Sequence, residues 1–124
     1  ELVNTAWAFA TAGVYAPRLY AAIAEAALSR LEEFQAQGLS NTAWAFATTG
    51  VEARHLFSAI STQARERPGE FNPQDIANTT WAFATAGIED RRLFHTIATA
   101  AQERLRDFNA QNIANTVWAF ATAG

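Results

Sequence analysis

One ten-residue phrase occurs four times along this chain at a constant interval. NTAWAFATAG begins at Asn4 and returns, with one change each time, at Asn41, Asn78 and Asn115, so that each copy starts 37 positions after the last. A fixed period between about 20 and 50 residues is typical of solenoids and other repeat arrays. A catalytic site is needed only once, so the repetition predicts a chain that is built by stacking similar units.

The segments between the phrases align as well, and they set the boundaries of the units. Phe34, Phe71 and Phe108 stand at the same offset in three successive segments. Neither end carries the atypical capping unit that repeat arrays use to cover their terminal faces. We therefore expect a fragment of a longer protein, with one array over 1–124 and units at about 2–38, 39–75, 76–112 and, in part, 113–124.

Each unit is predicted to form two helices. The signals for the start and end of the first helix are clearest in the third unit. Asn72 is a good N-cap, Pro73 suits the first helical position, and Asp75 follows at the third. Gly87 can take the left-handed conformation that ends a helix. The sequence thus predicts a helix from about Pro73 to Ala86.

The second helix of each unit is indicated by apolar residues at every fourth position. Leu93, Ile97, Ala101 and Leu105 form this stripe in the third unit, and the first unit repeats it with Leu19, Ile23, Ala27 and Leu31. In the second unit, Pro68 is expected to stop the helix near Arg67. The expected fold is all-α: an α-solenoid (superhelix) of stacked two-helix repeats with a 37-residue period.

The first helix is expected to have one apolar side and one small, polar side. At about 100° per residue the apolar side holds Ile76, Ala77, Thr80, Trp81, Phe83 and Ala84. The other side holds Asp75, Asn78, Thr79, Ala82, Thr85 and Ala86. The four Trp and the repeated Phe residues are expected in the core, although aromatic platforms can also stack nucleobases.

Composition argues against several classes of function. The chain has no Cys, a net charge of −3, and nine Arg without any Lys. His55 and His95 fall at different offsets, and no Gly-rich phosphate loop or nucleophile elbow is present. No apolar run approaches the roughly 20 residues of a membrane span. We expect no enzyme activity, catalytic residue, metal, cofactor or small-molecule substrate, and no membrane insertion.

The recurring asparagines are the first candidate binding residues. Asn4, Asn41, Asn78 and Asn115 lie in mid-helix, where Asn is a poor helix former, so each needs a compensating interaction. One alternative is a hydrogen-bond ladder to the backbone of the neighbouring unit. The other is a row of amides presented to a ligand.

Two positions vary from unit to unit and could therefore read a sequence. The first is occupied by Glu1, Gly38, Asp75 and Asn112, and the second by Val3, Ser40, Ala77 and Ala114. Codes that read one base per repeat use two or three such side chains. Neutral drift at surface positions would give the same variation.

Arginines recur at both ends of the second helices. Arg30, Arg67 and Arg104 stand near helix ends, where a cation favours the helix dipole. Arg18, Arg54, Arg91 and Arg92 stand at helix starts. They are either a row that meets phosphates or solvated surface charge.

The phrases NIANTVWAFATAG and FNPQDIANTTWAFATAG resemble the octotricopeptide and heptatricopeptide repeats of organellar proteins, which often precede a RAP domain. The resemblance implies an RNA-binding factor of the chloroplast or mitochondrion. By analogy with pentatricopeptide proteins, it also implies an RNA path lined by Asn41, Asn78, Asn115, Gly38, Asp75 and Asn112.

Two functions follow as expectations. The first is single-stranded RNA binding in organellar RNA metabolism, with amides on base edges and Arg54, Arg91 and Arg92 on phosphates. The alternative is a protein–protein interaction scaffold, or an accessory structural subunit of a large organellar complex. The net acidity, the absence of Lys and the uniform face of small residues favour this alternative.

Overall fold

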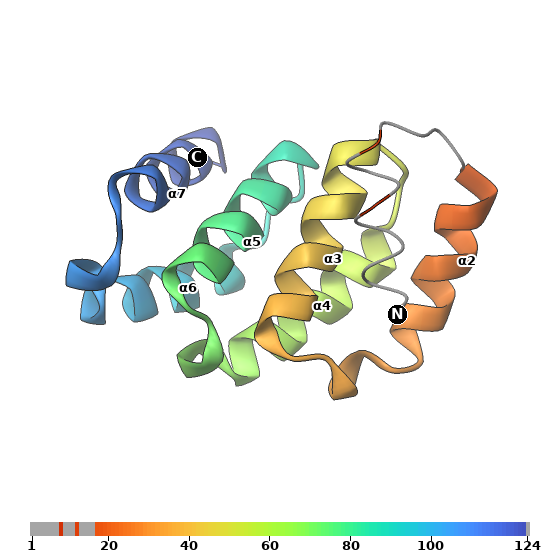
Figure 1. Ribbon diagram of the computed structural model, residues 1–124, viewed down its shortest axis with the longest axis horizontal. Helices are drawn as coiled ribbons and strands as arrows, with labels where there is room; N and C mark the ends of the chain where they lie inside the picture. Colours follow the sequence, from red (N-terminus) through yellow and green to blue (C-terminus); the bar gives the residue numbers. More distant parts are fainter. Residues whose placement is uncertain (1–7, 9–11, 13–16, 124) are drawn as a thin grey trace.

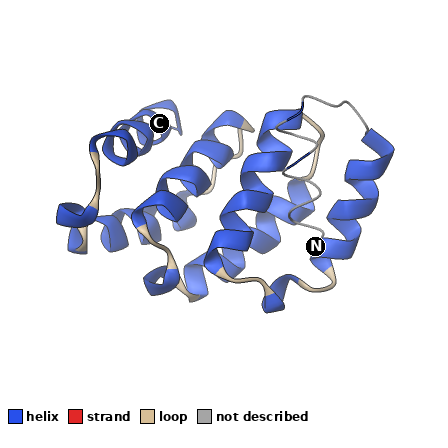
Figure 2. Cartoon of the chain, in the orientation of Figure 1, coloured by secondary structure: helices blue, strands red, loops and turns tan. Residues whose placement is uncertain are grey.

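Helices account for all the regular structure in the part of the chain that the computed structural model describes, which is residues 8, 12 and 17–123 (Figure 2). No strand occurs within these residues, so the all-α prediction is confirmed for them. The predictions that concern Glu1, Val3 and Asn4 lie outside the described residues. The α-helices are α2 (Pro17–Leu28), α3 (Ala36–Thr49), α4 (Arg54–Glu66), α5 (Pro73–Thr85), α6 (Arg91–Glu103) and α7 (Ala110–Ala123).

The helices lie in two layers (Figure 1). Helices α3, α5 and α7, here called the A helices, lie side by side, with α3 packed on α5 and α5 on α7. Helices α2, α4 and α6, the B helices, form the second layer, with α4 packed on both α2 and α6. Short 3-10 turns at η1 (Leu31–Glu33), η2 (Pro68–Glu70) and η3 (Leu105–Asp107) lead from each B helix toward the next A helix.

The capping residues that were predicted at the two ends of α5 are confirmed. The Asp75 backbone N–H donates to the Asn72 side-chain oxygen at 2.7 Å, and the Asn72 backbone N–H donates to Asp75 Oδ2 at 3.1 Å. This reciprocal capping box satisfies two N–H groups that a helix start leaves unpaired. At the other end Gly87 has φ of 71°, the left-handed region that favours glycine. Helix α4 ends at Glu66, before Pro68, as expected.

Edge-to-face aromatic pairs join each B helix to the A helix that follows it. Tyr20 meets Phe46 with ring centroids 5.6 Å apart, and both Phe57–Phe83 and Phe94–Phe120 are at 4.9 Å. Five of these six rings belong to the buried core and the sixth, Phe120, packs against its edge; Phe46, Phe57 and Phe83 are almost wholly buried. The prediction that the repeated Phe residues form the core is confirmed for Phe46, Phe71, Phe83 and Phe108; Phe34 and Phe120 pack against its edge, and Phe9 lies outside the described residues.

The apolar stripe of the B helices is shorter than predicted. Leu93, Ile97 and Ala101 are buried, but Leu105 is 55 % exposed. Leu105 lies in η3, beyond the end of α6, but the 3-10 turn alone does not expose it, because the equivalent Leu31 in η1 is buried where α4 packs on that turn. In the first unit Ile23, Ala27 and Leu31 are buried, whereas Leu19 is exposed.

The predicted polar side of α5 is wrong for three of its residues. Asp75, Thr79 and Ala82, predicted on the small polar side, are all buried. Their side of α5 faces α3, since the Ser40 hydroxyl of α3 donates to Asp75 Oδ1 at 3.4 Å. An A helix in this position is covered on three sides, by the A helices before and after it and by the B layer, so only a narrow strip reaches solvent.

Candidate interaction face

The exposed strip of each A helix carries the same four residue types at positions i, i+4, i+7 and i+11, which lie along one side of an α-helix. The Gln and Thr residues are exposed, and the Asn residues are half-buried. We call these twelve residues the A face: Gln37, Asn41, Trp44, Thr48, Gln74, Asn78, Trp81, Thr85, Gln111, Asn115, Trp118 and Thr122.

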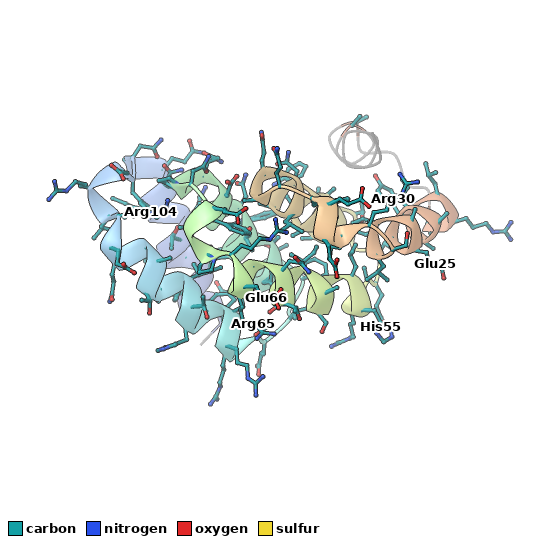
Figure 3. The ribbon with its side chains drawn as sticks, turned by 90° about the horizontal axis from the view of Figure 1, so that it is seen from below. Glu25, Arg30, His55, Arg65, Glu66 and Arg104 are labelled. Carbon is teal, nitrogen blue, oxygen red and sulfur yellow. The ribbon has the colours of Figure 1, made fainter. Side chains whose placement is uncertain are left out.

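The A face carries no charge. Asp75 is the one charged residue within α3, α5 and α7, and it is 4 % exposed. Among the described residues, the arginines and the other carboxylates lie on the B helices and on the connecting segments; Glu25, Arg65 and Glu66 are examples in Figure 3. A ligand on the A face would therefore meet amides, hydroxyls and indoles, without a cation to pair with phosphate.

The indoles of the A face form a row across the helices. Trp44 and Trp81 are half-buried and stack on each other, with ring centroids 6.3 Å apart and planes 27° from parallel. Trp118 is 46 % exposed. The prediction of core packing thus holds in part, because Trp44 and Trp81 pack against the edge of the core while one edge of the row faces solvent. The stack already covers a face of each ring that a nucleobase would need.

The amide groups are joined by a directed hydrogen-bond chain between two A helices. Asn112 Nδ2 of α7 donates to Gln74 Oε1 of α5 at 3.1 Å, and Gln74 Nε2 donates to Asn78 Oδ1 at 3.1 Å. Within residues 17–123 the side chains of Asn41, Asn78 and Asn115 donate to no backbone carbonyl of a neighbouring A helix, and the side-chain hydrogen bond found for them is the one that Asn78 accepts from Gln74. The described asparagines therefore do not form the backbone ladder that was one of the two alternatives.

The first variable position is not an exposed reading position. Asp75 and Asn112 are each 4 % exposed, and Gly38 is half-buried. Asn112 and Asn109 form a capping box like that of Asp75 and Asn72, with the Asn112 N–H donating to Asn109 Oδ1 at 2.7 Å. The expectation of a polar surface fails here because these side chains cap the start of their own helix and face the previous A helix.

The two variable positions instead meet each other across the helix junctions. Ser40 lies opposite Asp75 and donates to it. Ala77 is the residue of α5 equivalent to Ser40 and offers no hydroxyl, and there Asn112 donates to Gln74 instead. The sequence carried a signal for this pairing, because Ser accompanies Asp and Ala accompanies Asn at successive junctions. A search for paired variation across one repeat would have found it.

The arginines divide into two groups. Arg67 follows α4 directly, where its guanidinium donates to the Phe34 carbonyl at 2.8 Å and to Gln63 Oε1 at 3.1 Å, so it ties one unit to the previous one. Arg54, Arg91 and Arg92 are exposed at the starts of α4 and α6. Arg67–Glu70, at 3.6 Å, is the one ion pair found among the described residues.

Burial raises the pKa of Asp75 above its ordinary value of 3.8. The hydrogen bond from the Asn72 N–H, that from the Ser40 hydroxyl and the charge of Arg104 each act in the opposite direction, but burial is the largest influence. The protonated carboxyl is therefore favoured by folding, and its stabilisation is present below pH 3.8 and lost as the pH rises through the raised pKa.

Asp75→Asn should remove this pH dependence. Asn112 shows that Asn at this position keeps the capping box. We expect the stability of the wild type to fall relative to Asp75→Asn as the pH rises from 3.8 toward neutrality, because only the wild type must ionise a buried group. Urea unfolding of both proteins at several pH values measures this difference. A difference that is constant, or that changes in the other direction, would contradict it.

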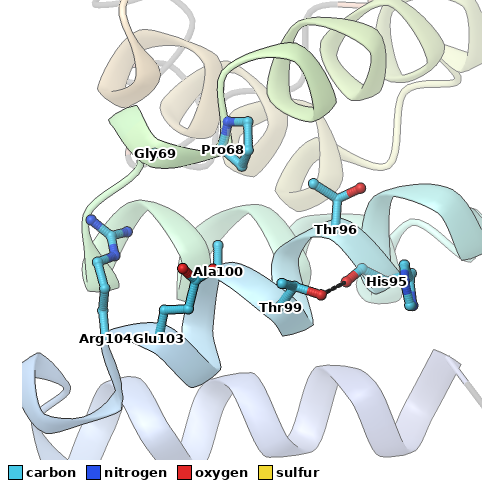
Figure 4. Close-up of a pocket in the computed structure, with 8 residues that line it drawn as sticks. All are labelled: Pro68, Gly69, His95, Thr96, Thr99, Ala100, Glu103 and Arg104. Atoms are coloured by element: carbon cyan, nitrogen blue, oxygen red, sulfur yellow. Dashed lines mark hydrogen bonds between the residues drawn. The ribbon is translucent and has the colours of Figure 1, made fainter.

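The described surface also contains a shallow groove on the B layer (Figure 4). It has a volume of about 350 Å³ and lies between the Pro68–Gly69 turn and α6, with His95, Glu103 and Arg104 in its lining. The hydroxyl of Thr99 donates to the His95 carbonyl at 3.2 Å, as in any helix surface. Within residues 17–123 no three His, Asp or Glu side chains are grouped to hold a metal ion, and no helix is of a length and hydropathy that could cross a membrane.

The helix pairs and the uniform A face define an all-helical protein with a repeated surface. The chain belongs to the RESC6 family: the model of that family, described as RNA-editing substrate-binding complex 6 protein, matches residues 1–124. No curated protein matches the chain. The family match overturns the expected membership of the octotricopeptide and heptatricopeptide repeat proteins. A 37-residue period with Ala, Trp and Phe at fixed places meets a general requirement of helix stacking, so it did not identify one family.

Proposed function

We propose that this protein is an accessory subunit of an RNA-editing complex and that its A face docks a segment of another protein subunit. In this proposal the chain is an α-solenoid with a 37-residue period and has no catalytic role. The observation that carries the proposal is the continuous, uncharged A face. The family supports it, since its description names a component of an RNA-editing substrate-binding complex. A mitochondrial setting agrees with that family, whereas a chloroplast has no support from it.

The chemistry of the A face suits a protein partner better than a nucleic acid. Phosphate contacts by Lys and Arg supply a large share of nucleic-acid affinity, and the A helices contain neither residue. Depletion of charge with Trp at the centre is instead typical of the buried part of protein interfaces. The rows of Gln, Asn and Thr supply the hydrogen-bonding groups that such an interface needs.

A second candidate function is single-stranded RNA binding along the edge where α4 and α6 begin. It is favoured by one observation, that Arg54, Arg91 and Arg92 are exposed there and make no ion pair among the described residues. The recurring Asn41, Asn78 and Asn115 would then be a separate, protein-binding surface. This candidate predicts RNA affinity that falls steeply with salt.

Co-purification from cells tests the main proposal. We expect the full-length protein with Asn41→Ala, Asn78→Ala and Asn115→Ala to lose most of its partner proteins, because three half-buried amides leave the A face together. The matched control replaces exposed polar residues of the B helices, with Ser58→Ala, Thr62→Ala and Thr99→Ala. Circular dichroism checks that both variants stay folded. Equal recovery of partners with both folded variants would contradict the proposal, and partners released by ribonuclease would favour the second candidate.

A further inference from the structure

We infer that the occupant of the A face is an uncharged, proline-rich peptide segment in the polyproline II conformation. The inference rests on the proposed function and specifies the partner chemistry of the same face. It follows from the direction of the amide hydrogen bonds and from the row of indoles, and it agrees with the usual distance between packed helices.

The direction of the hydrogen-bond chain makes Asn78 a donor to any ligand. At its buried end the Asn109 backbone N–H donates to Asn112 Oδ1 at 3.2 Å, which fixes the Asn112 oxygen and leaves its NH2 to donate to Gln74. The Gln74 NH2 then donates to the Asn78 oxygen. Amide orientation is assigned from such networks, and this one begins at a backbone N–H, which can only donate. The NH2 group of Asn78 is left without an acceptor among the described residues.

A donor on the surface calls for acceptors on the ligand. The backbone of a proline-rich segment presents carbonyl groups with few N–H groups, because proline has no backbone N–H. In polyproline II those carbonyls make no internal hydrogen bonds and remain available. A β-strand, by comparison, would bring as many N–H groups as carbonyls to the face.

The usual distance between packed helices agrees with this conformation. Packed helices lie about 8–10 Å apart, and one three-residue turn of polyproline II advances about 9 Å. Each turn of the peptide would therefore meet Asn41, Asn78 and Asn115 in succession with the same side. In a β-strand, residues three apart point to opposite faces, so that equivalent contacts would not recur from helix to helix.

The indole row provides the apolar part of the site. Proline-rich peptides bind aromatic-lined grooves, where their rings pack on the aromatic surfaces. The stack of Trp44 on Trp81 covers one face of each ring, so the proline rings would pack along the solvent-facing edge of this row and on Trp118, which is 46 % exposed. The neutrality of the face matches a ligand without charge and does not match RNA.

Titration of the isotope-labelled protein tests the inference. The probe is a capped peptide of three Pro-Pro-Leu triplets, compared with a capped peptide of the same composition in which the prolines precede the leucines. An oligouridylate is the RNA probe. We expect saturable shifts of the Asn side-chain NH2 and Trp indole signals with the triplet peptide, and weaker binding of the rearranged one. No saturation by about millimolar peptide, equal binding of both peptides, or displacement by the oligouridylate would overturn the inference.

Two variants test the donor step. Asn78→Ala should weaken peptide binding by about three- to tenfold, the equivalent of one hydrogen bond. Asn112→Asp removes the NH2 group that donates to Gln74, and residue 112 is itself buried. Gln74 then no longer fixes the orientation of the Asn78 amide, so peptide binding should weaken by about twofold or more. Asp75 shows that Asp at this position keeps the capping box, so the fold is expected to survive. Unchanged affinity of folded Asn112→Asp would overturn the directed chain.

The two proposals can fail separately. If the triplet peptide does not bind while the triple Asn→Ala variant still loses its protein partners in cells, the A face is the docking surface but its ligand is of another kind. If the variant keeps its partners, the proposed function itself is contradicted.

Discussion

Phe83→Ala is expected to lower the free energy of unfolding by about 3–5 kcal/mol, the usual cost of emptying a buried aromatic site. Phe83 is 0 % exposed, and its ring meets that of Phe57 edge to face at 4.9 Å. The change removes both the buried ring surface and an aromatic contact that joins α5 to α4. The neighbouring helices are held by similar pairs on either side, so the cavity is not expected to close.

Phe120→Ala is the matched control for this change. Phe120 is the same residue of the repeated phrase one unit later and also has an aromatic partner at 4.9 Å, Phe94, but it is only half-buried. Urea unfolding followed by circular dichroism should show a clearly smaller loss for Phe120→Ala. Equal losses would mean that burial in the repeat junction is not what stabilises α5.

Ala82→Leu is expected to cost about 1–3 kcal/mol and to weaken the coupling between units, because a larger side chain overpacks a closed junction. Ala45, Ala82 and Ala119 occupy one position of the A helices and are all 0 % exposed. Ala82 shares the α3-facing side of α5 with Asp75. In repeat proteins the junctions between neighbours carry the cooperativity of folding. The urea transition should therefore also broaden, and the free energy of unfolding should fall less steeply with urea concentration.

Thr85→Leu provides the control for the junction. Thr85 is exposed on the A face of α5. Thr85→Leu therefore introduces a Leu into the same helix, but at its surface and not between two A helices. We expect its effect to stay within about 0.5 kcal/mol. If Ala82→Leu is tolerated as well as Thr85→Leu, the A helices do not depend on close approach at this position.

Local features of the chain could be predicted from the sequence because they depend on neighbouring residues. The capping box of Asn72 and Asp75, the left-handed Gly87 and the end of α4 before Pro68 all follow from a few adjacent positions. The buried Phe residues were predictable for a related reason, since their spacing recurs in every unit. From these features, the paired helices were predicted correctly within the described residues.

The candidate site was predicted less well, because helical periodicity groups residues into sides but does not tell how many sides are covered. Asp75 and Ala82 were assigned to a polar surface, yet in the structure they lie against α3. Asn78, from the same predicted surface, does reach the exposed strip. Its hydrogen-bond chain through Gln74 to Asn112 spans two helices that are far apart in sequence, so no local pattern could reveal it.

Site-specific photo-crosslinking in the full-length protein tests most directly whether the A face docks a protein. A photoreactive residue replaces Thr85, which is exposed on the A face, or Thr62, which is exposed on α4 and serves as the control. We predict covalent attachment of a protein subunit at position 85, insensitive to ribonuclease, and little attachment at position 62. Attachment of RNA at position 85, or of the partner protein at position 62 alone, would contradict the account.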